Sequence, residues 1–236
     1  MARPPLTLVR QVDTHRLVPS KHTPGGDSVL SAIADDDEHL RAIFELDAAT
    51  NDRLLAEHQR LPDLGLEELV FGVPYATVVN AAFAHAHPLG SRFSGPHRGA
   101  WYAAFDLLTS QAEVAFHKSV QLAEIGRFDE TVTYDDYLAD FSASFHDLRR
   151  GRGFRGCLDP TSYLESQALA EGLLDADSLG VVYPSVRHDT GTCVACFRPT
   201  IVGNVRRDRT YRFTWKGTPE PVIVLDARER TARRGA

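Results

Sequence analysis

Three kinds of side chain suited to nucleotide chemistry occur close together between residues 90 and 118. Arg92 stands in a strand-like segment, an aromatic pair follows at 101–102, and Glu113 lies where a helix is expected to begin. A guanidinium grips phosphate oxygens with its planar fork, an aromatic face stacks on a flat ring, and a carboxylate stabilises a developing cation. Together these residue types favour a ligand that is a nucleotide with a reactive N-glycosidic bond.

Each of these side chains also has a purely structural interpretation. Ser110 and Glu113 have the spacing of a capping box, in which the glutamate only completes the start of a helix. Arg92 would then be a charge on a surface strand, and Tyr102 a half-buried packing residue. Spacing alone leaves both interpretations open.

Turn residues and apolar spacing predict the elements that would hold these side chains. Short strands are expected at 91–94 and 100–105, on either side of a turn rich in Gly and Pro, and a helix is expected at 110–125. A hairpin of the two strands would place the arginine and the tyrosine on adjacent strands. The helix would turn Glu113 toward the cleft between them.

The rest of the chain mixes helices and strands without the regular alternation of a doubly wound fold. This order predicts an α+β fold with a mixed, bent sheet and flanking helices. Residues 1–65 are expected to form an N-terminal extension, a loop followed by a helix, and residues 66–236 the main domain. Further helices are expected to begin at 74 and 162, and further strands are expected at 132–145, 180–185, 193–197, 211–215 and 221–225.

Composition excludes several broad classes of protein. The 236 residues are 43% hydrophobic and 25% charged, an ordinary globular balance. No apolar run approaches the ~18 residues of a membrane span, and three cysteines make no disulfide framework. A soluble, cytoplasmic protein is therefore expected. The net charge of −6 argues against general nucleic-acid binding, although residues 206–236 hold nine Lys and Arg against four Asp and Glu.

Standard catalytic motifs are absent from the sequence. It contains no P-loop, no Gly-x-Gly-x-x-Gly after a strand, no His-Glu-x-x-His and no Gly-x-Ser-x-Gly. Cys193 and Cys196, with His85 and His87, have residue types that bind zinc. However, residues i and i+3 of a strand face opposite ways, so the two cysteines are expected to be buried as small apolar residues.

Four short runs together resemble the RES domain, over about residues 70–215. The runs are Arg92-Phe-Ser, Trp101-Tyr102, Ala-Glu113-Val and Val182-Tyr-Pro-Ser185-Val-Arg187. RES proteins are toxins of RES–Xre toxin–antitoxin systems. Their fold resembles that of ADP-ribosyltransferases, and they degrade NAD⁺, some by hydrolysis and some by phosphorolysis. The resemblance therefore implies a toxin-like enzyme, either an NAD⁺ glycohydrolase or an NAD⁺ phosphorylase.

The resemblance also implies which residues bind the two ends of NAD⁺. Arg92 would hold the pyrophosphate, and Arg98 would assist it. Tyr102, with Trp101 as an alternate, would stack on the nicotinamide. The ligand would thus lie along the strands expected at 91–94 and 100–105.

The bond-breaking step is assigned to two further residues by the same resemblance. Glu113 would bind a ribose hydroxyl and stabilise the cation that forms at the anomeric carbon, as carboxylates do in glycoside cleavage. Ser185 would hydrogen-bond the nicotinamide or its ribose. By its spacing alone, His117 lies one helical turn after Glu113, where it would either orient Glu113 or be a packed helix histidine.

Two other classes of function remain open. An ADP-ribosyltransferase that modifies a macromolecule would need a docking surface for its acceptor, for which the Arg-rich segment 149–155 is the candidate. A non-catalytic nucleotide-binding module would use the same cleft for recognition alone. No cofactor and no metal are expected, because NAD⁺ is the substrate. The resemblance implies an Xre-like antitoxin as a partner, in a homo-oligomer or hetero-oligomer, without direct binding of nucleic acid or membrane.

Overall fold

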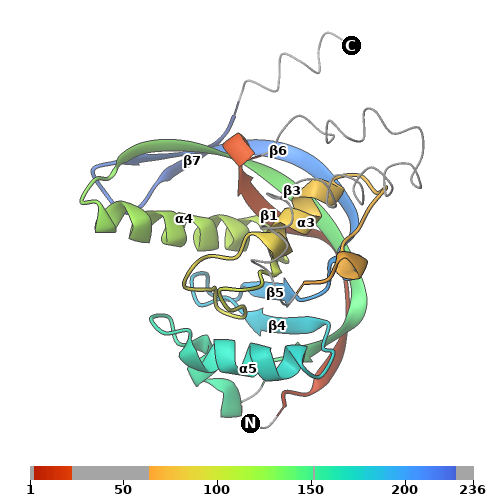
Figure 1. The fold of residues 1–236 in the computed structure, drawn as a ribbon. Coiled ribbons are helices and arrows are strands. Elements are labelled where there is room, and N and C mark those ends of the chain that lie inside the picture. Colours follow the sequence, from red (N-terminus) through yellow and green to blue (C-terminus); the bar gives the residue numbers. More distant parts are fainter. Residues whose placement is uncertain (1–2, 23–63, 151, 227–236) are drawn as a thin grey trace.

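The computed structural model describes residues 3–22, 64–150 and 152–226, and these form a mixed α+β fold (Figure 1). Its seven strands make one sheet in the order β1-β2-β5-β4-β3-β6-β7. The strands are β1 Leu6–Pro19, β2 Trp101–Ala104, β3 Asp129–Asp147, β4 Gly180–Pro184, β5 Thr192–Cys196, β6 Gly203–Lys216 and β7 Val222–Leu225. The α-helices are α3 Ala76–Ala84, α4 Leu107–Glu124 and α5 Leu164–Leu174, and the 3₁₀ segments are η1 Ser20–His22, η2 Leu66–Glu68, η3 Arg152–Phe154, η4 Gly156–Leu158 and η5 Pro199–Ile201.

The 19-residue strand β3 organises the sheet, because it pairs along both of its edges. One edge runs antiparallel to β1 over most of its length, and the other pairs with β6 and then, at its C-terminal end, in parallel with β4. Since β1 also meets β2 at His15 and Ala104, the strands β1-β2-β5-β4-β3 close into a ring. Register shifts on both edges of β3 mark where the strands bend. The predicted mixed, bent sheet is confirmed.

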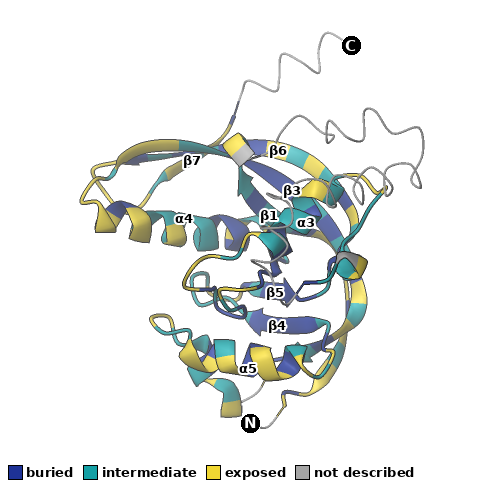
Figure 2. Ribbon diagram, viewed as in Figure 1, coloured by how far each residue is buried: buried dark blue, intermediate teal, exposed yellow. Residues whose placement is uncertain are grey.

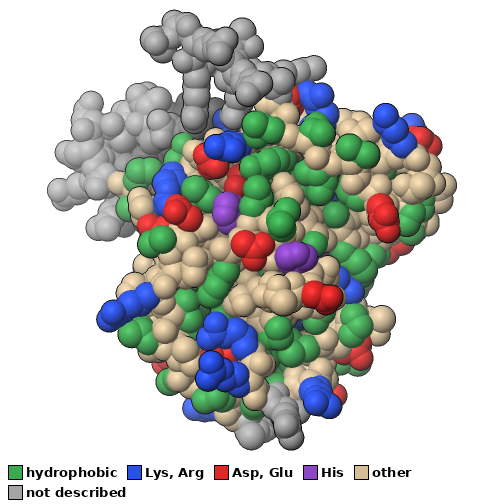
Figure 3. Space-filling model, turned by 180° about the vertical axis from the view of Figure 1, so that it is seen from behind, with side chains coloured by type: hydrophobic (Ala, Val, Ile, Leu, Met, Phe, Trp, Pro, Cys, Tyr) green, Lys and Arg blue, Asp and Glu red, His purple; other side chains and the backbone are tan. Residues whose placement is uncertain are grey.

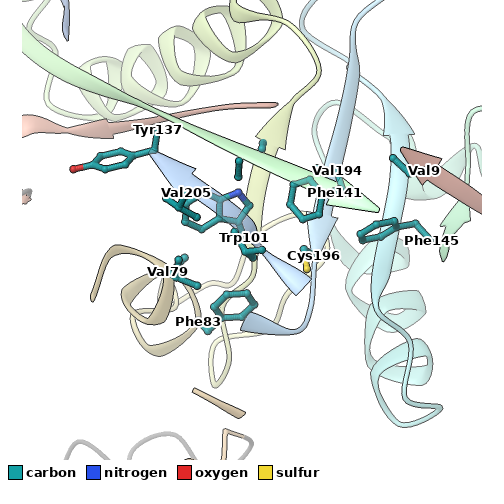
Figure 4. Close-up of a cluster of buried hydrophobic side chains, with 14 of the residues drawn as sticks. Val9, Val79, Phe83, Trp101, Tyr137, Phe141, Phe145, Val194, Cys196 and Val205 are labelled. Atoms are coloured by element: carbon teal, nitrogen blue, oxygen red, sulfur yellow. The ribbon is translucent and has the colours of Figure 1, made fainter. Parts of the chain in front are cut away.

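The short strands β2, β5 and β4 separate two hydrophobic clusters. Side chains alternate along these strands, so that Trp101, Val194 and Cys196 enter a cluster with α3, β1 and β3 (Figure 4). Their neighbours Ala195 and Cys193 enter a second cluster on the other face, beneath α5. The strands are consequently buried on both sides, as Figure 2 shows for β4 and β5.

Helix α4 covers the part of the sheet that extends beyond the ring. Its buried face, which includes Leu122, packs with Phe213 and Trp215 of β6 and Tyr134 of β3 in a third cluster. The opposite face of the helix is solvent-exposed (Figure 2). Among the described residues, no helix is long and apolar enough to cross a membrane.

The start of the chain differs from the expectation of a loop. Residues 6–19 form β1, a strand of 14 residues. The Pro, Gly, Ser and Asp residues that suggested a loop belong to the segment after Pro19, whereas Leu6 to Val18 is rich in Val, Leu and Thr, which favour strands. β1 therefore belongs to the same sheet as the main domain, across the boundary expected at residue 65. The helix expected near 36–60 and the last part of the basic C-terminal segment, residues 227–236, lie outside the described residues.

The start of α4 also corrects the sequence prediction. The N-cap residue is Asp106, whose Oδ1 accepts a hydrogen bond of 2.8 Å from the backbone N–H of Thr109. Ser110 lies inside the first turn and is buried. Aspartate caps a helix as well as serine does, and Leu107, which follows it, packs against the third cluster. The predicted capping box is wrong, and with it the purely structural interpretation of Glu113.

The hairpin predicted from 91–94 and 100–105 is wrong as well. Ser91 and Ser94 close a tight turn on each other by an isolated bridge, and β2 pairs with β1 and β5 instead. Gly90 enters this turn with φ +71°, and a Cβ there would lie 2.4 Å from the carbonyl oxygen of Ser94. The segment after Gly90 therefore folds back on itself rather than extending along β2.

An ion-pair cluster ties the loop before β2 to the segment after β5. Both nitrogens of the Arg98 fork donate to the carboxylate of Glu68, at 2.8 and 2.6 Å, and Arg198 donates to it at 2.7 Å. The Arg98 side chain is only 6% exposed, so its buried charge needs the carboxylate of Glu68 as a counter-ion. The hydrogen bonds from Arg98, with those from Arg198, hold the pKa of Glu68 at about 2.

Glu68→Gln should lower the free energy of unfolding by about 2–3 kcal/mol at pH 7, because a nearly buried guanidinium loses its anionic partner. A depressed folded-state pKa adds stability above the ordinary value of 4.5, and this stability is lost as the pH falls toward 2. The gap between variant and wild type should therefore shrink from pH 7 to pH 3 in urea melts. Glu67→Gln, at an exposed neighbour, is the control; a gap that does not change with pH would contradict this assignment.

Candidate active site

A hydrogen bond between Ser185 and Glu113 forms the centre of the candidate site. The Ser185 hydroxyl donates to Oε1 of Glu113 at 2.6 Å, and it accepts the backbone N–H groups of Arg187 and His188 at 3.1 Å each. Because the two N–H groups occupy the acceptor side of the hydroxyl, its only proton is directed at the carboxylate. Among the described residues, Oε2 of Glu113 has no hydrogen-bond donor, which leaves that oxygen available to a ligand.

His117 follows Glu113 by one turn of α4. Crowding of the ring by neighbouring atoms lowers the pKa of His117 below its usual 6.5 although the residue is solvent-exposed, and the nearby charges of Arg187 and Arg92 act in the same direction, against the effect of Glu113. The imidazole is therefore neutral at pH 7. No hydrogen bond joins it to Glu113 in the described part of the chain, so the orienting contact predicted for His117 is supplied by Ser185 instead.

Tyr102 is fixed to the tight turn at 91–94. Its hydroxyl accepts the backbone N–H of Phe93 at 3.0 Å and shares a hydrogen bond of 3.0 Å with the hydroxyl of Ser94. Burial raises the pKa of Tyr102 to about 12, so the phenol keeps its proton at physiological pH. The structure thus brings Tyr102 next to the segment that carries Arg92, although not by the predicted hairpin.

Arg92 is a buried arginine, 7% exposed, that is held by neutral groups. Its Nη1 donates to the backbone carbonyls of Cys157 and Asp159, at 3.2 and 2.7 Å, and its guanidinium carbon lies 4.7 Å from the ring centre of Tyr163. No carboxylate among the described residues forms an ion pair with it. Two backbone carbonyls and the ring of Tyr163 therefore fix the position of the Arg92 guanidinium, and no ion pair takes part.

Arg98 and Trp101, predicted as substrate-binding residues, occupy other places. Trp101 is fully buried in the cluster with α3 (Figure 4). It faces away from Tyr102, because successive residues of a strand point to opposite sides. The fork of Arg98 is occupied by Glu68. The structure therefore gives both residues structural roles, in the core and in the ion-pair cluster.

Arg187 and His188 join the site from the turn between β4 and β5, without having been singled out from the sequence. The guanidinium carbon of Arg187 lies 3.3 Å from the ring centre of Phe116, and His188 Nδ1 is 2.8 Å from the hydroxyl of Thr109. The run that resembles the RES domain ends at Arg187, so the sequence does contain a signal for this residue. In that run, however, the resemblance implies a role for Ser185 alone.

The two strand cysteines separate as the sequence predicts. Cys193 faces the site, with Sγ 3.9 Å from Oε1 of Glu113, whereas Cys196 faces the other cluster. Burial raises the pKa of both thiols, that of Cys196 to about 12. The described residues contain no group of three or more His, Cys, Asp or Glu side chains that could hold a metal ion.

A cavity of about 310 Å³ lies beside the site rather than in it. It opens between the 93–99 segment and α5, and neither Tyr102, Glu113 nor Ser185 lines it.

The reverse face of the molecule carries acidic, basic and histidine side chains interspersed with apolar ones, without a broad field of charge of one sign (Figure 3).

Comparison with known proteins adds a family to this geometry. The family model described as the RES domain matches residues 69–216, which is more than half of the chain. Among solved structures, the MbcT–MbcA toxin–antitoxin complex of M. tuberculosis is similar to this chain, at 11% sequence identity over 89% of this chain and 87% of that one, with a TM-score of 0.47. No curated protein matches the chain.

Proposed function

The chain belongs to the RES domain family, and we propose on this premise that it cleaves the nicotinamide–ribose bond of NAD⁺ with water or phosphate as the acceptor. The observation that carries the proposal is the carboxylate of Glu113, which is held through one oxygen by Ser185 and open at the other. Tyr102 and Arg92 lie within the same part of the molecule, on the side of the sheet opposite Trp101.

The chemistry of NAD⁺ explains why such a carboxylate would suffice. Nicotinamide departs from a positively charged ring and needs little help from an acid, so the barrier lies in the ribosyl cation that forms. Oε2 of Glu113 would bind a ribose hydroxyl and stabilise that cation, as carboxylates do in glycoside cleavage. Neutral His117 adds no opposing charge beside it. Ser185 would act as a positioning residue, because its hydroxyl already donates its hydrogen bond to Glu113.

The two ends of the substrate would be held by Arg92 and Tyr102. The guanidinium of Arg92 forms no ion pair among the described residues, which suits it to the pyrophosphate. The ring of Tyr102, kept neutral by burial, would stack on or near the nicotinamide. Both side chains depend on the tight turn at 91–94, because the hydroxyl of Tyr102 is bonded to it.

Incubation of the purified protein with NAD⁺, with and without inorganic phosphate, tests this proposal. Nicotinamide should be released without any macromolecular acceptor, and mass spectrometry of the second product, ADP-ribose or its phosphorylated form, should identify the acceptor. Transfer of labelled ADP-ribose to a protein or nucleic acid only, or no release by a protein that melts cooperatively, would contradict it.

An antitoxin partner belongs to the same proposal. An enzyme that drains NAD⁺ must be restrained in the cell that makes it, and the RES–Xre resemblance supports a DNA-binding antitoxin that covers the cleft. The chain itself, with a net charge of −6, is not expected to bind DNA.

A further inference from the structure

We infer that Arg187 is a second phosphate-binding residue, which forms with Arg92 a two-arginine site for phosphate groups. The inference rests on the proposed function and deepens it. The shared chemistry is recognition of a phosphate group, either in the pyrophosphate of NAD⁺ or as the free phosphate acceptor. Its basis is that backbone carbonyls of the segment 157–160 and aromatic rings hold both guanidiniums, with no ion pair to either among the described residues.

Arg187 is held by contacts that leave its charge uncompensated. Its guanidinium lies on the ring of Phe116, 3.3 Å from the ring centre, and its Nη2 donates to the backbone carbonyl of Pro160. Its Nε is buried and has no hydrogen-bond partner. No carboxylate in the described ranges forms an ion pair with Arg187. Nη1 of Arg187 donates no hydrogen bond within the described ranges, which leaves this donor for a ligand oxygen.

Arg92 is held in the same manner and by the same segment. Its Nη1 donates to the carbonyls of Cys157 and Asp159, and its guanidinium lies over the ring of Tyr163. The segment 157–160 thus presents three backbone carbonyls, those of Cys157, Asp159 and Pro160, to two arginines that are distant from each other in sequence. Each guanidinium is fixed by carbonyls on one side and by an aromatic ring on another.

The two arginines also share the neighbourhood of the carboxylate. The charges of both act on His117, which lies one turn from Glu113, and both depress the pKa of this imidazole. The backbone N–H of Arg187 is bonded to Ser185, the residue that holds Glu113. A phosphate group bound by the arginines would therefore lie beside the carboxylate that acts on the ribose.

Electrostatics favours a ligand at this place over a purely structural role. Two like charges held near each other repel, and partly buried charges without counter-ions are unfavourable in the free protein. Arg98, unlike these two arginines, has its fork filled by the carboxylate of Glu68. A phosphate group supplies the missing negative charge and accepts from planar guanidinium forks.

Binding and kinetics of Arg187→Gln test the inference. In thermal melts at constant ionic strength, inorganic pyrophosphate should raise the melting temperature of the wild type, and much less that of Arg187→Gln. The same variant should raise the KM for NAD⁺ or the half-saturating phosphate concentration by about tenfold or more, with kcat changed by less than about threefold. A raised KM for NAD⁺ would show that the two arginines bind the pyrophosphate of NAD⁺. A raised half-saturating phosphate concentration would show that they bind the free phosphate acceptor.

Matched variants keep the test decisive. Arg155→Gln removes the same charge from an exposed position nearby and should change neither binding nor kinetics. Arg187→Lys should recover part of the affinity, which a misfolded variant would not. If wild-type and Arg187→Gln proteins respond equally to pyrophosphate, phosphate and NAD⁺, the inference is wrong. Should pyrophosphate binding depend on both arginines while the wild type releases no nicotinamide, the anion site stands and the proposed function falls.

Discussion

Glu113→Gln is expected to slow NAD⁺ cleavage by about 10²-fold or more, because an amide cannot supply the negative charge that stabilises a ribosyl cation. Stability should change by less than about 1 kcal/mol. The glutamine Oε1 can still accept the hydrogen bond from Ser185, and Glu113 takes no part in capping α4, whose N-cap is Asp106. Steady-state release of nicotinamide and a thermal melt measure the two quantities.

Glu124→Gln makes the matched control for this experiment, since it removes the same charge from the exposed end of the same helix. It should leave turnover unchanged. Expression of the wild type alone should arrest growth, whereas the Glu113→Gln protein should accumulate without that effect. Near-normal turnover in Glu113→Gln would remove the carboxylate from the mechanism.

Arg92→Lys should weaken NAD⁺ binding by about 1–3 kcal/mol, the range for hydrogen bonds to charged groups. Lysine keeps the charge but loses the planar fork, so one phosphate contact is lost and the ribose shifts relative to Glu113. A higher KM and a lower kcat are therefore expected together. Some stability should be lost too, because Nη1 of Arg92 anchors the carbonyls of Cys157 and Asp159.

The two effects of Arg92→Lys are separated by assaying well below its melting temperature. Arg155→Lys, at an exposed position of the same segment, should have wild-type kinetics and stability. Loss of stability with unchanged KM and kcat would make Arg92 a structural anchor only, and would take the pyrophosphate contact out of the proposed site.

Local patterns in the sequence predicted the central pair of the site but not all of its surroundings. Glu113 and Ser185 stand in short runs that resemble the RES domain, and the structure joins them by a hydrogen bond across 72 residues. Trp101 and Tyr102 could not both face a ligand, because neighbours on a strand alternate; the period of two was sufficient to exclude one of them. Burial alone shows that the excluded residue is Trp101.

The remaining differences come from contacts that are distant in sequence. Arg98 looks like a phosphate ligand until Glu68 is found 30 residues before it, and Arg187 looks like an ordinary turn residue until Phe116 and Pro160 are placed beside it. The sheet predicted from residue 132 onward was confirmed element by element. β1 was missed because the Pro- and Gly-rich residues that follow it dominated the local composition.

The double pairing of β3 has a consequence for how the protein acquires its structure. Most of its length pairs with β1, where His146 bonds to Pro4 across 142 residues, and its N-terminal part pairs with β6, which in turn pairs with β7. Contacts between such distant parts form late and slow the search for the native state. The ring of β1, β2, β5, β4 and β3 can close only after β5, Thr192–Cys196, has been synthesised. Under the proposed function, cleavage of NAD⁺ would therefore begin only after Ser185 and the ring-closing strand β5 have been synthesised.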